Sequence, residues 1–162
     1  MNAKVGSSDQ VQTLKNVEEI FNEAKQFAQQ HDLNFTGSLS PKQAWKLVES
    51  ADVVLVDVRT NEERKFVGYI SESVHIAWAT GTAFNRNPRF LKELENKVGK
   101  DKTILLLCRS GKRSALAAEA AFNAGFQNIY NILEGFEGDL NKNNQRNQIN
   151  GWKTHQLPWV QD

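Results

Sequence analysis

The single cysteine of this chain, Cys108, stands where an apolar segment meets a short cationic loop. The segment at 103–107 (TILLL) is typical of a strand buried on both faces, and residues 115–124 have high helix propensity. Between them, Gly111 allows the backbone to bend so that consecutive N–H groups point inward. The N-terminus of the following helix, with its free N–H groups and the positive end of the helix dipole, lies at the same place and attracts an anion. The sequence therefore predicts an anion-binding cradle with a thiol inside it.

Such a cradle favours the thiolate, which is the nucleophilic form of cysteine. A helix N-terminus stabilises an anion by about 0.3–2 kcal/mol, and a hydrogen bond to a charged group contributes about 1.5–3 kcal/mol. The nearby cations Arg109, Lys112 and Arg113 exceed what a thiolate alone needs, and arginine has a planar fork that suits oxyanions. We infer a nucleophilic cysteine that acts on a small anionic sulfur compound. The alternative is a buried, inert cysteine beside a solvated basic turn.

The composition is that of an ordinary one-domain protein, with 162 residues of which 40% are hydrophobic and 24% charged. A net charge of +1 argues against a nucleic-acid or anionic-membrane partner. No apolar run approaches the ~20 residues that span a bilayer, and the first residues lack the pattern of a secretory signal. His31, His75 and His155 are scattered, so we expect no metal site and no cofactor. One cysteine without an internal partner fits a reducing, cytoplasmic setting.

Strand and helix patterns alternate along the chain, which leaves connections long enough for parallel pairing. We therefore predict an α/β fold with a central, mostly parallel sheet and helices on both faces. Ser40, Pro41 and Gln43 form a clear helix start with a capping box. The other expected elements are helices at 60–67, 88–98 and 115–124, and strands at 34–39 (ended by Gly37), 53–58, 74–76, 103–107 and 128–133.

Apolar residues at helical spacing also predict a helix at 8–31, capped by Ser7 or Ser8. We expect it to pack on the domain, and a short dimer seam is the alternative because the spacing resembles heptads. The Asn/Gln-rich stretch at 141–150 is expected to be a solvent-facing loop. Trp152 and Trp159 are expected to anchor the C-terminal tail.

Two polar residues interrupt the predicted strands. Asp57 lies at the C-terminal end of its strand, where ligands of open α/β sheets gather, so it is either functional or the partner of a nearby cation. His75 would act as a base only if it faced the site, and we expect it to be satisfied locally.

The cysteine loop (CRSGKRS, 108–114) resembles the active-site loop of rhodanese-like sulfurtransferases. The resemblance runs from about Ser38 to Trp159, so we place a rhodanese-like domain at 34–162 after an N-terminal helical extension at 1–33. Two departures do not touch the loop: Tyr69 stands where many members have His, and 70–74 lacks the usual Pro-Gly turn. Further segments match single-domain members in the same order, namely DVR at 57–59 with Glu63, GYI at 68–70, GF at 125–126, YNILEGF at 130–136, GW at 151–152 and LPW at 157–159.

The resemblance implies a five-stranded parallel sheet and a two-step sulfur transfer. Cys108 would take the outer sulfur of thiosulfate or a similar donor, and its persulfide would pass that sulfur to cyanide, a thiol or an acceptor protein. Asp57 and Arg59 would brace the loop. The donor and the thiolate would be held by the residues that follow the cysteine, Arg109, Ser110, Gly111, Lys112, Arg113 and Ser114.

Other functions are less compatible with the loop. Cysteine phosphatases and arsenate reductases place an arginine six positions after the cysteine, where this chain has Ser114, and Arg113 falls one residue short. A thioredoxin-like role is disfavoured because there is no Cys-x-x-Cys motif. A non-catalytic interaction or sensing module of the same fold stays open as an alternative. The donor, the acceptor and the oligomeric state carry no motif of their own.

Overall fold

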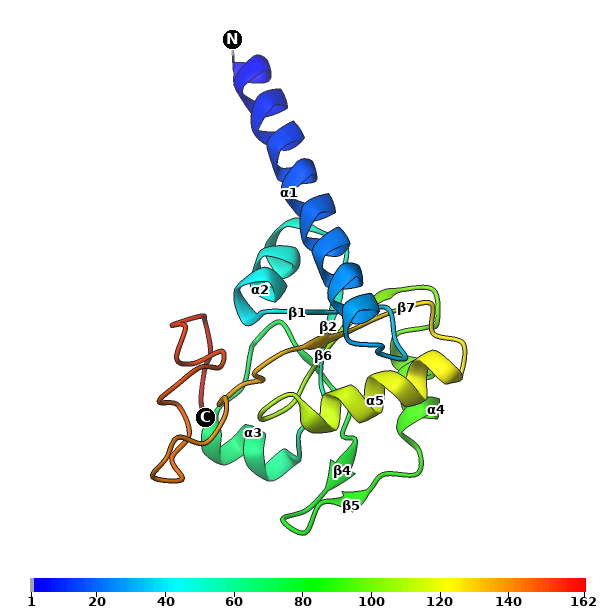
Figure 1. Cartoon of the computed structure of the whole chain (residues 1–162), viewed down its shortest axis with the longest axis vertical. Coiled ribbons are helices and arrows are strands. Elements are labelled where there is room, and N and C mark those ends of the chain that lie inside the picture. Colours follow the sequence, from blue (N-terminus) through cyan, green and yellow to red (C-terminus); the bar gives the residue numbers. More distant parts are fainter. Residues whose placement is uncertain (1) are drawn as a thin grey trace.

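The computed structural model describes the backbone of residues 2–162 and the side chains from residue 8 onward. A long helix leads into an α/β domain, and the C-terminal segment wraps one end of that domain (Figure 1). The helices are α1 (Asn2–Gln30), α2 (Pro41–Ser50), α3 (Asn61–Val67), α4 (Phe90–Lys97) and α5 (Lys112–Asn123). The strands are β1 (Gly37–Leu39), β2 (Val54–Asp57), β3 (Val74–His75), β4 (Ala79–Thr80), β5 (Asn85–Arg86), β6 (Thr103–Leu107) and β7 (Asn128–Ile132).

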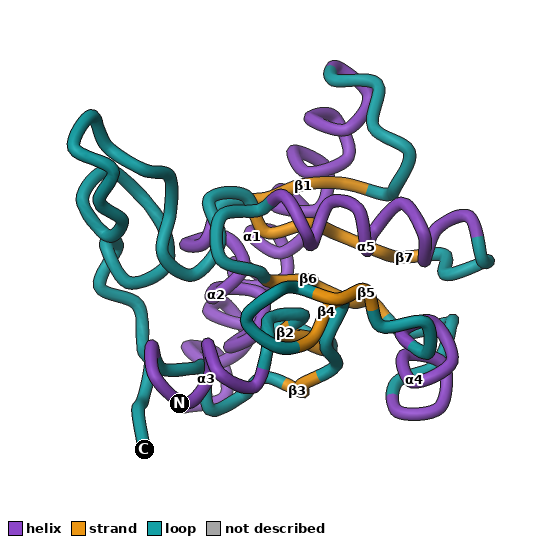
Figure 2. The backbone as a smooth tube through the Cα atoms, turned by 90° about the horizontal axis from the view of Figure 1, so that it is seen from below, coloured by secondary structure: helices purple, strands orange, loops and turns teal. Residues whose placement is uncertain are grey.

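The main sheet has five strands in the order β1-β7-β6-β2-β3, and all four pairings are parallel. Figure 2 shows these strands one after another through the middle of the molecule. The predicted α/β architecture with a five-stranded parallel sheet is therefore confirmed. The strands β4 and β5 form a separate antiparallel hairpin that the sequence did not predict, because two residues per strand are too few to show a pattern.

Helices cover both faces of the sheet, as predicted, and β6 shows how the sequence directs this. Its residues alternate in direction because successive side chains of a strand point to opposite faces. Ile104 and Leu106 join the apolar cluster that contains residues of α4 and α5. Leu105 and Leu107 join the cluster on the other face, to which α1 and α2 contribute. Residues 104–107 of this strand are fully buried, and Cys108 follows at its carboxyl end.

Helix boundaries follow local capping where a cap is present. Ser40 and Gln43 make the predicted reciprocal hydrogen bonds before α2, of 3.2 and 3.0 Å. Other boundaries were wrong. Helix α1 begins at Asn2, so neither Ser7 nor Ser8 caps it, because a serine inside a helix costs little. Helix α5 begins at Lys112 and α4 at Phe90, so the first starts earlier and the second later than expected.

Helix α1 extends well beyond the domain at its N-terminal end and packs on the domain at its C-terminal end (Figure 1). Val11 and Leu14 are 62% and 63% exposed, whereas Ala24 is buried. A Cβ atom at Gly37 would lie 2.8 Å from the backbone of Ala24, so a glycine is needed where the helix crosses β1. Gly37 thus begins the strand and does not end it, contrary to the expectation. Within residues 2–162, no helix has the length and apolar character needed to cross a membrane.

The C-terminal segment is tied to the domain by its aromatic residues. Trp152 is fully buried and donates its indole N–H to the carbonyl of Pro158 at 2.9 Å, as expected of an anchor. Trp159 stays 39% exposed and meets the ring of Phe136 edge-on. The last residues are held by the paired backbones of Tyr69 and Val160.

Candidate functional site

Cys108 directly follows β6 and lies at the N-terminal end of α5. Its side chain is 1% exposed. The Sγ atom accepts a hydrogen bond from the backbone N–H of Gly111 at 3.1 Å, and the Ser114 hydroxyl lies 3.2 Å away. Gly111 is the N-cap of α5 and has a φ of +95°, which side chains rarely adopt. The sulfur therefore sits where helix N–H groups and the helix dipole favour an anion.

The backbone of the cysteine loop is held from below by the turn at 134–138. The carbonyl of Cys108 accepts the N–H of Phe136 at 2.8 Å, and the carbonyl of Arg109 accepts the N–H of Glu137 at 2.9 Å. Gly135 allows this close approach, because a Cβ there would lie 2.5 Å from the carbonyl carbon of Arg109. Segments some 25 residues apart in the sequence thus form one rigid support.

The hydroxyl of Ser114 has two acceptors and one proton. Its Oγ atom lies 3.2 Å from Cys108 Sγ and 2.5 Å from Oδ1 of Asn131 on β7. The amide group of Asn131 is oriented by its own donation to the carbonyl of Gly111 at 3.2 Å. Because a hydroxyl donates only one hydrogen bond, Asn131 competes with the sulfur for the Ser114 proton.

The three cations of the loop differ in their partners. Arg113 forms a two-pronged ion pair with Glu63 of α3, with N–O distances of 2.7 and 2.9 Å. Burial alone would raise the pKa of Glu63, but the hydrogen bond and charge of Arg113 outweigh it and hold that pKa below 4.5. Burial would likewise lower the pKa of Arg113, and Glu63 raises it above its ordinary value. Arg113 is thus a neutralised link between two helices.

Arg109 and Lys112, the other two cations of the loop, line a cavity of about 280 Å³ beside it. Arg113 also contributes to the lining, as does Arg146 from the Asn/Gln-rich loop. Among the residues that the structure describes, no carboxylate lies within 4 Å of Arg109, Lys112 or Arg146. The Nε atom of Arg109 is buried and has no hydrogen-bond partner among them either. The cavity is therefore positively charged and open to an anion. Its lining residues are Phe84, Arg109, Ser110, Lys112, Arg113 and Arg146.

A larger hollow of about 650 Å³ lies elsewhere, between the C-terminal ends of α1 and α5. It contains neither Cys108 nor any of the loop cations. The smaller cavity is the better candidate for a substrate, because residues of the loop that directly follows Cys108 line it together with cations that have no carboxylate partner.

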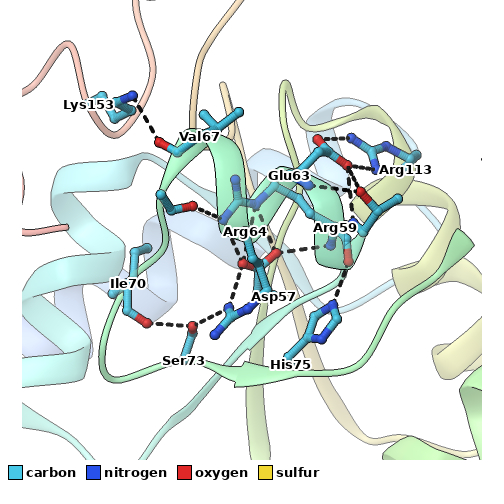
Figure 3. Close-up of polar contacts among 12 residues, drawn as sticks. Asp57, Arg59, Glu63, Arg64, Val67, Ile70, Ser73, His75, Arg113 and Lys153 are labelled. Carbon is cyan, nitrogen blue, oxygen red and sulfur yellow. Dashed lines mark hydrogen bonds and ion pairs between the residues drawn. The ribbon is translucent and has the colours of Figure 1, made fainter. Parts of the chain in front are cut away.

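Asp57 and Arg59 form a buried ion pair behind the loop, together with Arg64 (Figure 3). Both carboxylate oxygens of Asp57 accept hydrogen bonds from Arg59, and Arg64 adds a bond of 2.8 Å. Burial alone would raise the pKa of Asp57, but the two arginines outweigh it and lower that pKa below 3.8. The Arg59 guanidinium stacks 4.2 Å from the ring of Phe136, whose N–H supports Cys108. This geometry supports the interpretation of Asp57 and Arg59 as a brace.

His75 does not line the cavity. It places its Nε2 atom 2.7 Å from the carbonyl of Arg59, so it is satisfied locally as expected (Figure 3).

Of the backbone N–H groups proposed to hold the sulfur, the N–H of Gly111 lies within hydrogen-bonding distance. Within residues 2–162, no three potential ligand side chains are grouped as a metal site would require.

Three residues near the site were not identified from the sequence. Asn131 carried a usable signal, because a polar residue between apolar neighbours in a buried strand needs a partner, just as Asp57 does. Phe84 lies in the short hairpin and Arg146 in the Asn/Gln-rich loop, and neither stands in a recognisable pattern. Only the fold brings them to the cysteine loop.

Comparison with known proteins agrees with this geometry. Rv0390 of M. tuberculosis, known from a crystal structure, is 40% identical with a TM-score of 0.72, and the match covers 79% of this chain and 99% of that one. An uncharacterised protein of Rickettsia conorii is 38% identical over 118 residues, 70% of this chain and 87% of its own length. The thiosulfate sulfurtransferase GlpE of Coxiella burnetii is 29% identical over 113 residues, 65% of this chain and 95% of its own length.

The family model that describes the rhodanese-like domain matches residues 40–142, from the cap of α2 to the loop beyond β7. This span contains the whole parallel sheet except β1, together with the cysteine, its two hydrogen-bond donors and the buried ion pair. The chain therefore belongs to the rhodanese-like domain family.

Proposed function

We propose that this protein is a sulfurtransferase that moves a sulfane sulfur from thiosulfate, or a similar donor, to a thiophilic acceptor through a persulfide on Cys108. The thiolate of Cys108 attacks the outer sulfur of thiosulfate, and a new S–S bond forms. The bond between the two donor sulfurs breaks, and its electron pair leaves with sulfite. The persulfide and sulfite together carry the same charge as the thiolate and thiosulfate did.

The observation that carries the proposal is the position of the Cys108 sulfur. It lies at the N-terminus of α5, 3.1 Å from the Gly111 N–H and 3.2 Å from the Ser114 hydroxyl, beside a cavity with unpaired cations. The same donors suit the thiolate and the persulfide anion, so the enzyme does not have to rearrange between the two steps. The likeness to a curated thiosulfate sulfurtransferase adds support.

The second step discharges the persulfide. An acceptor such as cyanide, a thiol or a protein thiolate attacks the outer sulfur, and the S–S bond to Cys108 breaks with its electron pair on Cys108. The chain has one cysteine and hence no internal thiol to resolve the persulfide. A separate acceptor must therefore complete the cycle.

Intact-mass measurement tests the first step. After incubation with thiosulfate and removal of excess reagent, the chain should gain the mass of one sulfur atom, and cyanide should remove that mass while thiocyanate appears. Cys108→Ser is the matched control and should gain nothing. A wild-type chain that stays unmodified would support the alternative of a non-catalytic interaction module and overturn the proposal.

Phosphate-ester hydrolysis is the competing activity, and the geometry disfavours it. The guanidinium of Arg113, one residue short of the position that phosphatases use, is occupied by both carboxylate oxygens of Glu63. We expect no turnover of an aryl phosphate above the rate of the Cys108→Ala variant. Turnover that depends on Cys108 would contradict the sulfurtransferase assignment.

A further inference from the structure

We propose that the acceptor served by this site is a small organic thiol that carries carboxylates, and that Arg146 binds those carboxylates at the mouth of the cavity. This inference rests on the proposed function, because it concerns the discharge of the Cys108 persulfide. It gives a role to the 139–150 loop, which lies at the orange-to-red end of the chain in Figure 1.

Electrostatics supply the first argument. Discharge brings an acceptor thiolate against a persulfide anion, and two like charges repel strongly where water is partly excluded. Arg109, Lys112 and Arg146 line the cavity without carboxylate partners among the described residues. A single thiolate does not require three free cations, but an acceptor with further negative charges would pair with them. The buried, unpartnered Nε of Arg109 is one donor that such a ligand satisfies.

The position of Arg146 supplies the second argument. Its Nη1 atom donates to the carbonyl of Gly138 at 2.8 Å, which ties the guanidinium to the backbone just before the loop. The loop is held by short bonds within it: Asn141 Oδ1 accepts the N–H of Gln145 at 2.9 Å, and the N–H of Asn147 reaches the carbonyl of Glu137 at 2.9 Å. These bonds of Asn141 and Asn147 hold the loop, and the loop holds Arg146 in place. A cation whose position is already fixed binds an anion with less loss of entropy.

One residue that lines the cavity, Phe84, is aromatic, and this suits an organic molecule better than a bare inorganic ion. Phe84 lies on the β4–β5 hairpin with its ring 4.5 Å from the guanidinium carbon of Arg113 and 5.6 Å from that of Arg109. It has a φ of +55° and stays 39% exposed. Backbone strain in a non-glycine residue often accompanies a functional position. The ring offers a surface for the carbon skeleton of the acceptor.

Size agrees with this assignment. The cavity of about 280 Å³ is close to the lower limit of about 300 Å³ for pockets that bind small organic molecules.

In the transfer itself, the acceptor RS⁻ forms a bond to the outer sulfur, and the bond from that sulfur to Cys108 breaks. The products are RSS⁻ and the Cys108 thiolate, so charge and electrons balance without an oxidant.

The experiment compares two thiols on the preloaded enzyme. Cys108 is first loaded with thiosulfate, and the extra sulfur is verified by mass. The rate constant for its removal is then measured with mercaptosuccinate, which has two carboxylates, and with the neutral 2-mercaptoethanol, at equal thiolate concentration. We expect the wild type to prefer mercaptosuccinate at least tenfold. That preference should shrink at high salt, which screens exposed charges.

Arg146→Gln should lower the preference for mercaptosuccinate by about tenfold, since one charged hydrogen bond is worth about 1.5 kcal/mol or more and 1.4 kcal/mol is a factor of ten. The matched control is Lys142→Gln, which removes the same charge from an exposed position of the same loop that does not line the cavity. It should leave the ratio within about twofold.

The outcomes separate the two proposals. A wild type that never acquires the persulfide overturns the sulfurtransferase assignment and this inference with it. A wild type that loads but discharges both thiols equally, or an Arg146→Gln variant with an unchanged ratio, overturns the inference alone. Equal losses in Arg146→Gln and Lys142→Gln would also contradict it, because the effect would then be one of overall charge.

Discussion

The Ser114 hydroxyl stands between a sulfur atom and an amide oxygen, and its single proton cannot serve both. When the proton points to Cys108, it stabilises the thiolate; when it points to Asn131, the thiolate loses a donor. Hydrogen bonds to charged groups are worth about 1.5–3 kcal/mol. The pair Ser114 and Asn131 is therefore expected to set how strongly the cradle holds negative charge.

Opposite effects are expected from removing the two partners. Ser114→Ala removes the donor and should slow the loading of Cys108 with sulfur from thiosulfate at neutral pH by about tenfold, since a hydrogen bond to a charged group is worth about 1.5 kcal/mol or more and 1.4 kcal/mol is a factor of ten. Asn131→Leu frees the proton for the sulfur and should speed that loading. Intact mass against time measures both rates, and Cys108→Ser provides the baseline. If both variants changed the rate in the same direction, the competition would be refuted and a purely structural role supported.

At the same scale, the sequence indicated the position of Cys108 between a strand and a helix better than it indicated the surroundings of the sulfur. Cys108, the loop cations and Ser114 are adjacent in the chain, so their proximity follows from a short loop before a helix. Asn131 and Arg146 come from elements that are distant in sequence. The pairing of Arg113 with Glu63 was equally hidden, because an ion pair between two helices depends on how the helices are placed.

At the scale of elements, the connection between β2 and α3 carries the largest concentration of buried charge. Asp57 and Arg59 are both fully buried, and Arg64 is 18% exposed. Removing one member of a buried ion pair leaves the other charge without a partner, which costs about 3–5 kcal/mol. We therefore expect the group to hold the turn under the cysteine loop only while it is complete.

Asp57→Asn should lower the free energy of unfolding by about 3 kcal/mol or more, because the Arg59 guanidinium then remains buried without a counter-charge. Chemical denaturation followed by tryptophan fluorescence measures the change. Asp52→Asn is the matched control, since Asp52 is exposed, and it should alter stability by less than about 0.5 kcal/mol. Equal stability of the two variants would show that Asp57 braces nothing.

Acid should destabilise the link between α3 and α5. The pKa of Glu63 lies below its ordinary value of 4.5 in the folded chain, so the unfolded chain binds more protons as the pH falls through that range. The stability that the Arg113 pair adds is therefore present at neutral pH and lost below about pH 4.5. Glu63→Gln should be less stable at neutral pH, and its free energy of unfolding should fall less steeply in acid. Chemical denaturation at a series of pH values measures this. If the free energies of unfolding of the wild type and of Glu63→Gln fell equally steeply with pH, this account would be contradicted.

Element limits were predicted well where a local signal sets them. The capping box at Ser40 and the apolar run of β6 act through neighbours in the chain, and both matched the structure. The N-terminus of α1 lacked such a signal, and the predicted start was six or seven residues late. The β4–β5 hairpin was missed because tertiary packing, here of Trp78 against Phe90 at 5.2 Å, holds so short a pair of strands.

At the scale of the whole molecule, helix α1 has two different halves. Its N-terminal half protrudes from the domain, and its C-terminal half belongs to the core. Ile20, Ala24 and Ala28 are buried, and the first two pack against residues of the sheet, whereas Val11 and Leu14 stay exposed. The family model matches from residue 40 onward, and the domain boundary near residue 33 stays a prediction.

Two truncations test this division. A chain that begins at residue 13 should keep its stability within about 0.5 kcal/mol, because residues 8–12, the removed part whose side chains the structure describes, are all exposed. A chain that begins at residue 34 should lose about 3 kcal/mol or more, since each large side chain returned to water costs about 1.5–3 kcal/mol. Thermal unfolding compares the two. A stable chain from residue 34 would show instead that α1 is an appendage.

The parallel pairing of β1 with β7 has a consequence for how the chain reaches its fold. β1 has no other neighbour in the sheet, and the N–H of Ile129 meets the Thr36 hydroxyl from 93 residues away. Contacts over such separations form slowly, because the loop must close before they stabilise anything. β1 is synthesised before the other strands of its sheet, yet it is expected to be the last to join them, and its amide protons should gain protection during refolding after those of β2 and β6.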